Sequence, residues 1–379
     1  MANQFFLFRL VIMSTNTPIA PPSRSVSQAG GGGAMGNPML RFSDQEKSLW
    51  RDSVPKVVVT GLKKSGKSSI LRVLFNKVSP HEACYLEPTM SPSFLPLAAN
   101  PLLNVRIAEI PGNWSWGEES DQIDELFFGK CHSVIVVIDS STDEVPHSVF
   151  SVAKRVIARA FKISKNIHFH LFLNKVDANY RFDPDSAQSE NNKVSFVQQI
   201  VGRVRDDVRN LLGNNGSSFQ IDLAAHCTSI FDSSINEAFS KVIQRPLLAN
   251  GKIEQILDII ANSCKMEKAV LFDAVSKLTL GADNRTQTDA STLSLMQDVL
   301  EVVIDMSSIY GTTGATTTTD TRTICDISLA NGDVISMRLI EKNLALVSIF
   351  KNENFEKTFL LNHNIAAFKD ALMQLVALS

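Results

Sequence analysis

Residues 61–68, Gly-Leu-Lys-Lys-Ser-Gly-Lys-Ser, have the glycine spacing and the lysine of a phosphate-binding loop. The glycines let the backbone curl so that successive N–H groups point at phosphate oxygens, and a helix that begins near Lys67 adds its positive dipole end. Lys67 would reach the β and γ phosphates of a nucleotide, and Ser68 would ligate Mg²⁺. An apolar run precedes the loop and a helical pattern follows it, as this motif requires. The pattern predicts the nucleotide-binding residues Gly61, Lys63, Lys64, Ser65, Gly66, Lys67, Ser68 and Ser69.

A second short motif, Asn-Lys-Val-Asp at 174–177, follows a predicted strand over residues 168–173. The Asp177 carboxylate matches the paired N1–H and exocyclic amine donors of guanine, which adenine lacks. The aliphatic stem of Lys175 can cover the plane of the base, and Asn174 can tie this loop to the phosphate-binding loop. A site built to satisfy the guanine donors rejects a base without them. The motif therefore predicts GTP and GDP as ligands.

Glu109, Gly112 and Asn113 follow another predicted strand, at the place where small GTPases carry Asp-x-x-Gly-Gln. In that pattern the acid holds Mg²⁺ through water, the glycine N–H contacts the γ-phosphate, and the glutamine orients the attacking water. Glu109 is one methylene longer than Asp and still suits the metal. Asn113 is one methylene shorter than Gln, and about 1 Å of misplacement matters to catalysis. Slow hydrolysis and a binding-only switch both fit these residues.

Two other loops are expected to face the same ligand. Thr89 has the position of a first switch loop, where its hydroxyl would ligate Mg²⁺ and its N–H would contact the γ-phosphate, although an ordinary loop threonine is the alternative. Backbone N–H groups of Ser229 and Ile230 would donate to the guanine carbonyl, unless these residues form a plain turn. Trp114 and Trp116 could contact a partner from the second switch loop or pack beneath it.

The elements that position these residues alternate between apolar strands and amphipathic helices over residues 54–246. Alternating strands and helices imply a mostly parallel sheet with helices on both faces, which is an α/β fold. Ligands bind such sheets at the carboxyl ends of the strands, where the predicted motifs lie. The expected strands cover residues 57–60, 105–110, 133–139 and 168–173, with another near 219–225, and the expected helices cover residues 68–76, 149–161, 194–212 and 234–243.

A different pattern follows the break at Pro246, and it predicts a separate domain over residues 250–379. A helix precedes a short strand pair near 269–273 and 277–280, and a second helix covers residues 291–309. Three alternating runs at 324–329, 334–340 and 344–350 come before a last helix. This order indicates an antiparallel sheet with segregated helices, an α+β domain. Because the domain carries no cluster of catalytic residue types, a binding or assembly role is its default.

The composition excludes several classes of protein. The formal net charge of −2 gives no electrostatic case for nucleic-acid binding. The five cysteines are scattered and form no CxxC pair, so neither a disulfide framework nor a metal cage is expected. This cysteine usage fits a protein of the reducing cytosol. The sequence contains no run of 18 or more apolar residues, so we expect no membrane-spanning helix. Residues 1–50, rich in Ser, Pro and Gly with a short apolar start, are expected to form a disordered extension.

Together these residues resemble the Rag GTPases, specifically the C/D branch of that family. The phosphate-binding loop with its two lysines is close to the Gly-Leu-Arg-Arg-Ser-Gly-Lys-Ser-Ser of that branch. Further matches cover residues 86–89, 110–112, 228–232 and 237–242 in the first domain. In the second domain they cover residues 267–277 and 302–311.

The resemblance implies a GTPase domain followed by a roadblock-type domain, through which a C/D-type chain pairs with an A/B-type Rag GTPase as a heterodimer. Such heterodimers sit on the lysosomal or vacuolar membrane through a scaffold complex and report amino-acid supply to the TOR kinase complex. Lys63 and Lys64 would then block an inserted arginine finger of the usual kind. Asn174 departs from the histidine of that family, while Glu109 and Asn113 depart from its Asp and Gln. Membrane recruitment through partners, without direct insertion, is expected because no terminal cysteine box is present.

We therefore expect a guanine-nucleotide switch subunit with slow GTP hydrolysis, which uses Mg²⁺ and pairs with a paralogous chain. A non-hydrolysing scaffold subunit that keeps one nucleotide bound is the first alternative. A P-loop ATPase or kinase and a stand-alone monomer are the others.

Overall fold

The computed structural model describes residues 7–11, 54–98, 100–114, 116, 121–142, 145–183, 188–212, 221–247, 251–285, 289–310, 323–355 and 358–377. The chain divides into two compact units. One consists of Trp50–Ile253 and Val275–Gly281, and the other of Met1–Leu49, Glu254–Ala274 and Ala282–Ser379. The first unit contains every residue predicted to bind nucleotide.

The first unit is built on a sheet with the strand order β3-β4-β2-β5-β6-β7. All neighbouring pairs are parallel except β3 with β4. The sheet is therefore mostly parallel, as the alternating pattern predicted. Its strands are β2 (Lys56–Gly61), β3 (Ser93–Ala98), β4 (Asn104–Glu109), β5 (Ser133–Asp139), β6 (His168–Asn174) and β7 (Leu223–Thr228).

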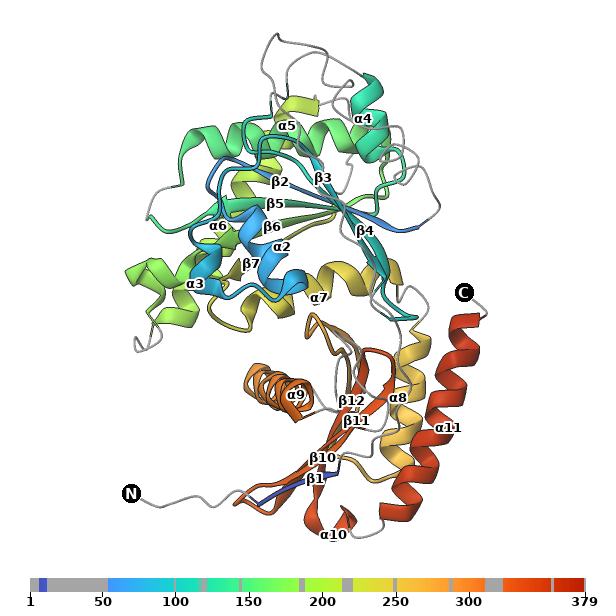
Figure 1. Ribbon diagram of the computed structural model, residues 1–379. Helices are drawn as coiled ribbons and strands as arrows, with labels where there is room; N and C mark the ends of the chain where they lie inside the picture. Colours follow the sequence, from blue (N-terminus) through green and yellow to red (C-terminus); the bar gives the residue numbers. More distant parts are fainter. Residues whose placement is uncertain are drawn as a thin grey trace. The chain divides into compact units, whose positions relative to one another are not determined.

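Helices cover both faces of this sheet, which is why its central strands are apolar along their whole length. Val57 to Val59 in β2 and Val134 to Ile138 in β5 are at most 1% exposed. Figure 1 shows α2 and α7 on one face and α4 and α5 on the other, and α6 packs against α5. These helices are α2 (Lys67–Asn76), α4 (Asp121–Phe128), α5 (His147–Ile163), α6 (Ser189–Leu212) and α7 (Ser234–Leu247), and the one-turn helix α3 (Pro80–Ala83) follows α2.

Two strands of this sheet differ from the expectation. β3 contains Pro96, which breaks the apolar pattern of a strand, and it is tolerated because β3 is the edge strand next to β4. β7 lies at residues 223–228, whereas the sequence favoured a strand near 219–225; residues 213–220 are outside the described ranges. The central residues of β7, Ala-Ala-His-Cys, have little β-forming character, so the pattern gave no clear end for this strand.

The second sheet is antiparallel, with the strand order β1-β10-β11-β12-β8-β9. Its strands belong to the second unit except β9, most of which falls in the Val275–Gly281 segment of the first. Figure 1 shows α9 on one face of this sheet and α8 and α11 on the other. The core lies between α9 and β8, β10, β11 and β12. This arrangement confirms the α+β fold expected after the GTPase-like domain. Its elements are β1 (Leu7–Val11), α8 (Lys252–Ser263), β8 (Lys268–Asp273), β9 (Thr279–Ala282), α9 (Ala290–Tyr310), β10 (Ile324–Ser328), β11 (Asp333–Glu341), β12 (Leu344–Lys351), α10 (Asn352–Phe355) and α11 (Thr358–Ala377).

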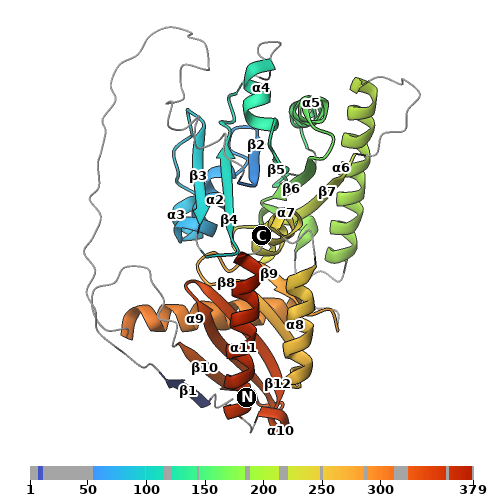
Figure 2. The same cartoon turned by 90° about the vertical axis from the view of Figure 1, so that its right-hand side faces the viewer.

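The N-terminal segment differs from the expected disordered extension at five residues. Leu7–Val11 form β1, which pairs antiparallel with β10 from Leu7 opposite Ser328 to Val11 opposite Ile324 (Figure 2). Without β1, β10 would be the edge strand of the sheet. An edge strand offers a row of backbone donors and acceptors, and a short apolar segment can satisfy them. The other residues of the expected 1–50 extension lie outside the described ranges.

Among the described helices, none is both long and apolar enough to cross a bilayer.

Candidate functional site

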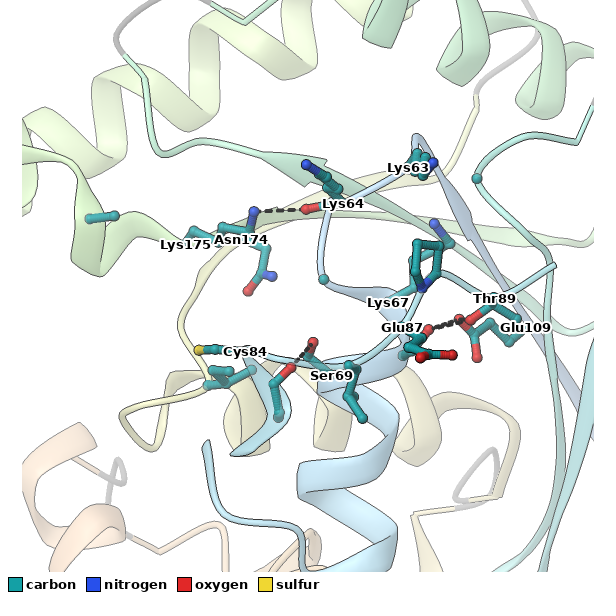
Figure 3. Close-up of a pocket in the computed structure, with 18 of the residues that line it drawn as sticks. Lys63, Lys64, Lys67, Ser69, Cys84, Glu87, Thr89, Glu109, Asn174 and Lys175 are labelled. Carbon is teal, nitrogen blue, oxygen red and sulfur yellow. Dashed lines mark hydrogen bonds between the residues drawn. The ribbon is translucent and has the colours of Figure 1, made fainter. Parts of the chain in front are cut away.

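A cavity of ≈ 630 Å³ opens at the carboxyl ends of β2, β4 and β6 (Figure 3). It brings together motifs that are more than 100 residues apart in the sequence. Gly61, Ser65 and Ser229, which were also predicted as site residues, are not among the residues that line it. The predicted residues that line the cavity are Lys63, Lys64, Gly66, Lys67, Ser68, Ser69, Thr89, Glu109, Gly112, Asn113, Asn174, Lys175, Asp177 and Ile230.

The loop between β2 and α2 needs glycine at two positions. Gly61 has φ +142°, and a Cβ there would lie 2.2 Å from the carbonyl oxygen of Val137. Gly66 has φ +99°, and a Cβ there would lie 2.3 Å from Nδ2 of Asn174. Gly66 is also the N-cap of α2, where no side chain caps the helix and no acidic residue occupies the first turn. The first N–H groups of α2 therefore face the cavity with the positive end of the helix dipole, which is a site for an anion.

Lys67 is buried at the start of α2, with 5% of its surface exposed. Its Nζ donates to the carbonyl oxygens of Gly61 at 3.0 Å and Leu62 at 2.9 Å. Burial lowers the pKa of Lys67 to about 8, and the nearby Glu109 carboxylate opposes this shift. A buried ammonium at the anion-binding end of a helix is suited to neutralising phosphate.

Ser68, Thr89 and Glu109 converge from three separate segments. The Ser68 hydroxyl lies 2.7 Å from that of Thr89 and donates to Oε1 of Glu109, and the Thr89 hydroxyl lies 3.3 Å from the same oxygen. Figure 3 shows Thr89 beside Glu109. Hydroxyl and carboxylate oxygens are the hard ligands that Mg²⁺ prefers, so these three side chains fit that ion. In the described ranges no three His, Cys, Asp or Glu side chains group to hold a metal, so such an ion would also need phosphate and water oxygens.

The segment after β4 lies directly on the phosphate-binding loop. A Cβ on Gly112 would lie 2.3 Å from the backbone nitrogen of Lys63, so only glycine permits this approach. Asn113 is exposed and lines the cavity. Trp116 is 8% exposed and stacks on Phe128, with 5.9 Å between the ring centroids. Trp114 is half-buried against the edge of Phe127. Both tryptophans therefore pack against phenylalanines of the same unit, as the second of the two interpretations predicted.

The loop after β6 is bonded to the phosphate-binding loop in two places. Asn174 Nδ2 donates to the carbonyl oxygen of Ser65 at 2.9 Å, and Thr228 at the end of β7 donates to Asn174 Oδ1 at 3.3 Å. Lys175 Nζ donates to the carbonyl oxygen of Lys64 at 2.7 Å. Asp177 is exposed in a single 3-10 turn and lines the cavity. The loop thus presents an accessible carboxylate next to the phosphate-binding loop, as guanine recognition requires.

Two predicted residues use their polar groups within the protein. The Ser229 N–H donates to the Ser234 hydroxyl at 2.9 Å, while Ile230 lines the cavity. The Ser69 hydroxyl donates to the carbonyl oxygen of Ala83 at 2.9 Å and so ties α2 to α3. Of the Ser229-Ile230 pair, Ile230 is the residue positioned to meet a ligand.

Part of the cavity wall was not predicted as a site. Ala83 and Cys84 come from the short helix α3 and the residue after it, and Phe231 from the loop before α7. Phe231 is 47% exposed and lies against His81, with 5.4 Å between ring centroids. No periodicity or motif marks Ala83 and Cys84, and Phe231 lies in the 228–232 match without having been assigned to the site. All three reach the cavity through tertiary geometry.

Comparison with known proteins finds a family match that extends over parts of both units. Residues 56–306 match the model of the Gtr1/RagA G protein conserved region. The chain is 33% identical over 335 residues to Ras-related GTP-binding protein D of Mus musculus, covering 88% of this chain and 70% of the relative. It is 32% identical over 322 residues to Ras-related GTP-binding protein C of Homo sapiens, covering 84% of this chain and 76% of the relative. It is 29% identical over 325 residues to the GTP-binding protein gtr2 of Schizosaccharomyces pombe, covering 84% of this chain and 97% of the relative.

Proposed function

The chain belongs to the Gtr1/RagA family of G proteins, and from that premise we propose that it is the C/D-type, guanine-nucleotide-binding switch subunit of a Rag-type heterodimer. In this role it relays amino-acid availability to the TOR kinase complex at the lysosomal or vacuolar membrane. The observation that carries the proposal is the meeting, in one cavity, of the phosphate-binding loop, the 174–177 loop and the Ser68-Thr89-Glu109 cluster.

The protein's own groups account for binding of the phosphates. Lys67 and the first N–H groups of α2 neutralise negative charge at the end of β2. Mg²⁺, when bound by Ser68, Thr89 and Glu109 with phosphate oxygens, neutralises charge on the β and γ phosphates. Thr89 and Gly112 come from separate loops, and loss of the γ-phosphate removes the group that both would contact. Nucleotide state is thereby converted into loop position.

Asp177 selects the base. Its carboxylate is exposed to the cavity and can accept from both guanine donors, whereas adenine presents no such pair. This favours a GTPase over a P-loop ATPase or kinase.

Hydrolysis is proposed to be slow. The Asn113 amide is one methylene shorter than the glutamine that orients water in small GTPases, and Lys63 and Lys64 occupy the rim where an inserted arginine finger would approach. A subunit that binds without hydrolysing is the second candidate, and the same Asn113, with Glu109 in place of Asp, is the observation that favours it.

Pairing is proposed to use the second unit. Leu295, Val302 and Ile309 recur every seven residues along α9 and are 40%, 46% and 71% exposed. Exposed apolar side chains aligned along one helix support the proposal that another protein covers this surface. The occupant we propose is an A/B-type Rag GTPase, and a scaffold complex then recruits the pair to the membrane.

The test uses the full-length chain, purified with any chain that copurifies. We expect retained GDP or GTP, displaced by guanine but not adenine nucleotides, and single-turnover phosphate release that Lys67→Ala abolishes. Displacement by equimolar ATP would refute the assignment of Asp177. Stable binding without phosphate release would favour the scaffold subunit over the switch.

A further inference from the structure

Asp139, the last residue of β5, belongs to none of the motifs above and is bonded to two groups near the site. Its Oδ1 accepts the N–H of Ser141 at 3.0 Å, and its Oδ2 lies 2.6 Å from Lys175 Nζ. The same ammonium donates to the carbonyl oxygen of Lys64 at 2.7 Å. One ammonium therefore links the end of β5, the guanine-binding loop and the phosphate-binding loop.

The two lysines that this link joins both have an unusual backbone conformation. Lys64 and Lys175 both have φ +65°, a left-handed conformation that non-glycine residues rarely adopt. The Lys175 side chain is long and 37% exposed, so without a partner it would sample many rotamers in water. A carboxylate on one side and a carbonyl oxygen on the other restrict the ammonium to one place.

Asp139 is ionised when it makes this contact. Burial alone would raise its pKa, but the hydrogen bonds from Lys175 and Ser141 outweigh burial and hold the pKa below its ordinary value. The side chain of Asp139 is itself 35% exposed, and the backbone pairing of β5 with β6 does not depend on it. Its carboxylate is therefore placed to orient Lys175 more than to hold the sheet together.

We propose that Asp139 is a positioning residue for the nucleotide. It holds the Lys175 ammonium against the Lys64 carbonyl oxygen, so that the aliphatic stem of the lysine keeps one conformation against the guanine base. This inference rests on the proposed nucleotide-binding function. In this role Asp139 connects the loop that recognises the base with the phosphate-binding loop, because both are joined through Lys175.

The experiment measures dissociation of a fluorescent GDP from the full-length chain. Asp139→Asn, which keeps the shape but removes the charge, is expected to speed dissociation about three- to tenfold, the range for losing a partly exposed charged hydrogen bond. Asp139→Glu, which restores a carboxylate at a half-exposed position, is expected to recover most of the slow dissociation. Asp206→Asn on α6 is the matched control, since its ion pair with Arg209 lies outside the cavity lining.

A double-mutant cycle separates positioning from a structural role. In a Lys175→Ala background, Asp139→Asn is expected to add no further acceleration, because the group that it positions is gone. The thermal midpoints of Asp139→Asn and Asp206→Asn are expected to agree within a few degrees. Additive effects in the cycle, or no rescue by Asp139→Glu, would overturn the role of Asp139.

The failure of this inference is distinguishable from that of the proposed function. Wild-type protein that retains guanine nucleotide, with Asp139→Asn unchanged in its dissociation rate, overturns the positioning role alone. Wild-type protein that binds no guanine nucleotide overturns both.

Discussion

Lys67 illustrates how a single buried charge sets the chemistry of the site. Its ammonium is held by two loop carbonyl oxygens and has its pKa lowered to about 8 by burial. A phosphate placed beside it would reverse that shift, because a nearby negative charge favours the protonated form. Binding of nucleotide and retention of the Lys67 proton are therefore linked.

The linkage predicts a pH dependence of GDP affinity. Below about pH 8 Lys67 is protonated in both free and bound protein, and affinity is constant. Above that pH the free protein loses the proton while the bound protein keeps it, so the dissociation constant is expected to rise about tenfold per pH unit. Calorimetric titration between pH 7 and 9 measures this rise. Lys67→Arg, which stays protonated, is the control for titration of the base, and an equal slope in both proteins would contradict the assignment.

Asn113 is the residue at which the proposed function separates nucleotide binding from hydrolysis. Asn113→Gln is expected to increase the single-turnover rate of GTP hydrolysis at least about tenfold, because the longer amide can reach the attacking water. Asn113→Ala is expected to leave the wild-type rate nearly unchanged, since the native amide contributes little. Phosphate release with pre-bound GTP measures both. A Gln variant no faster than wild type would show that the limitation lies elsewhere, for example at Lys63 or Lys64.

The residues that could be predicted from sequence are those whose chemistry is local to a motif. Lys67, Ser68 and Asn174 were recognisable because each follows a strand at fixed spacing from glycines or acids. Asp139 was not, because its role depends on Lys175 approaching from the next strand, 36 residues later. Ser229 was predicted as a ligand contact, but its N–H donates to Ser234 through loop geometry that no spacing encodes.

At the scale of elements, apolar patterning predicted the strands that are buried on both faces and missed two strands at the edges of the sheets. β5 is a continuous β-branched run and lies where the sequence placed it. β3 was missed because Pro96 interrupts it, and β1 because a short apolar start has no strand neighbour in sequence. Edge strands take their partner from tertiary structure, so their own sequence carries a weaker signal.

Two glycines in helical surroundings allow a matched test of the phosphate-binding loop. Gly66→Ala is expected to abolish nucleotide retention, because φ is +99° and the new Cβ would meet Asn174 Nδ2 at 2.3 Å. Gly202→Ala in α6 meets nothing within 4 Å and is expected to stabilise the protein by about 0.5–1 kcal/mol, raising its midpoint by about 1–4 °C. Thermal unfolding and bound-nucleotide analysis measure both. A Gly66→Ala protein with full nucleotide content would contradict the site geometry.

At the scale of the whole molecule, the two units have separate cores and separate exposed features. The first unit carries the nucleotide cavity, and the second carries the apolar stripe on α9, whose buried side fills the core through Met296, Leu300 and Val303. A helix with apolar residues on its exposed side as well as its buried side leaves apolar surface in contact with water in a single chain.

Substitution on the stripe should therefore separate pairing from nucleotide binding. Val302→Asp places a charge at the centre of the stripe, and burying it against a partner without a counter-charge is expected to reduce recovery of the paralogous subunit at least about tenfold. Co-purification with quantification of both chains measures the loss, and bound nucleotide per chain is expected to stay unchanged. Ile259→Asp on α8, at a residue that is 65% exposed on the other face of the sheet, is the matched control. If both variants lost the partner equally, the cause would be general damage to the second unit; if neither did, pairing would use a surface other than α9.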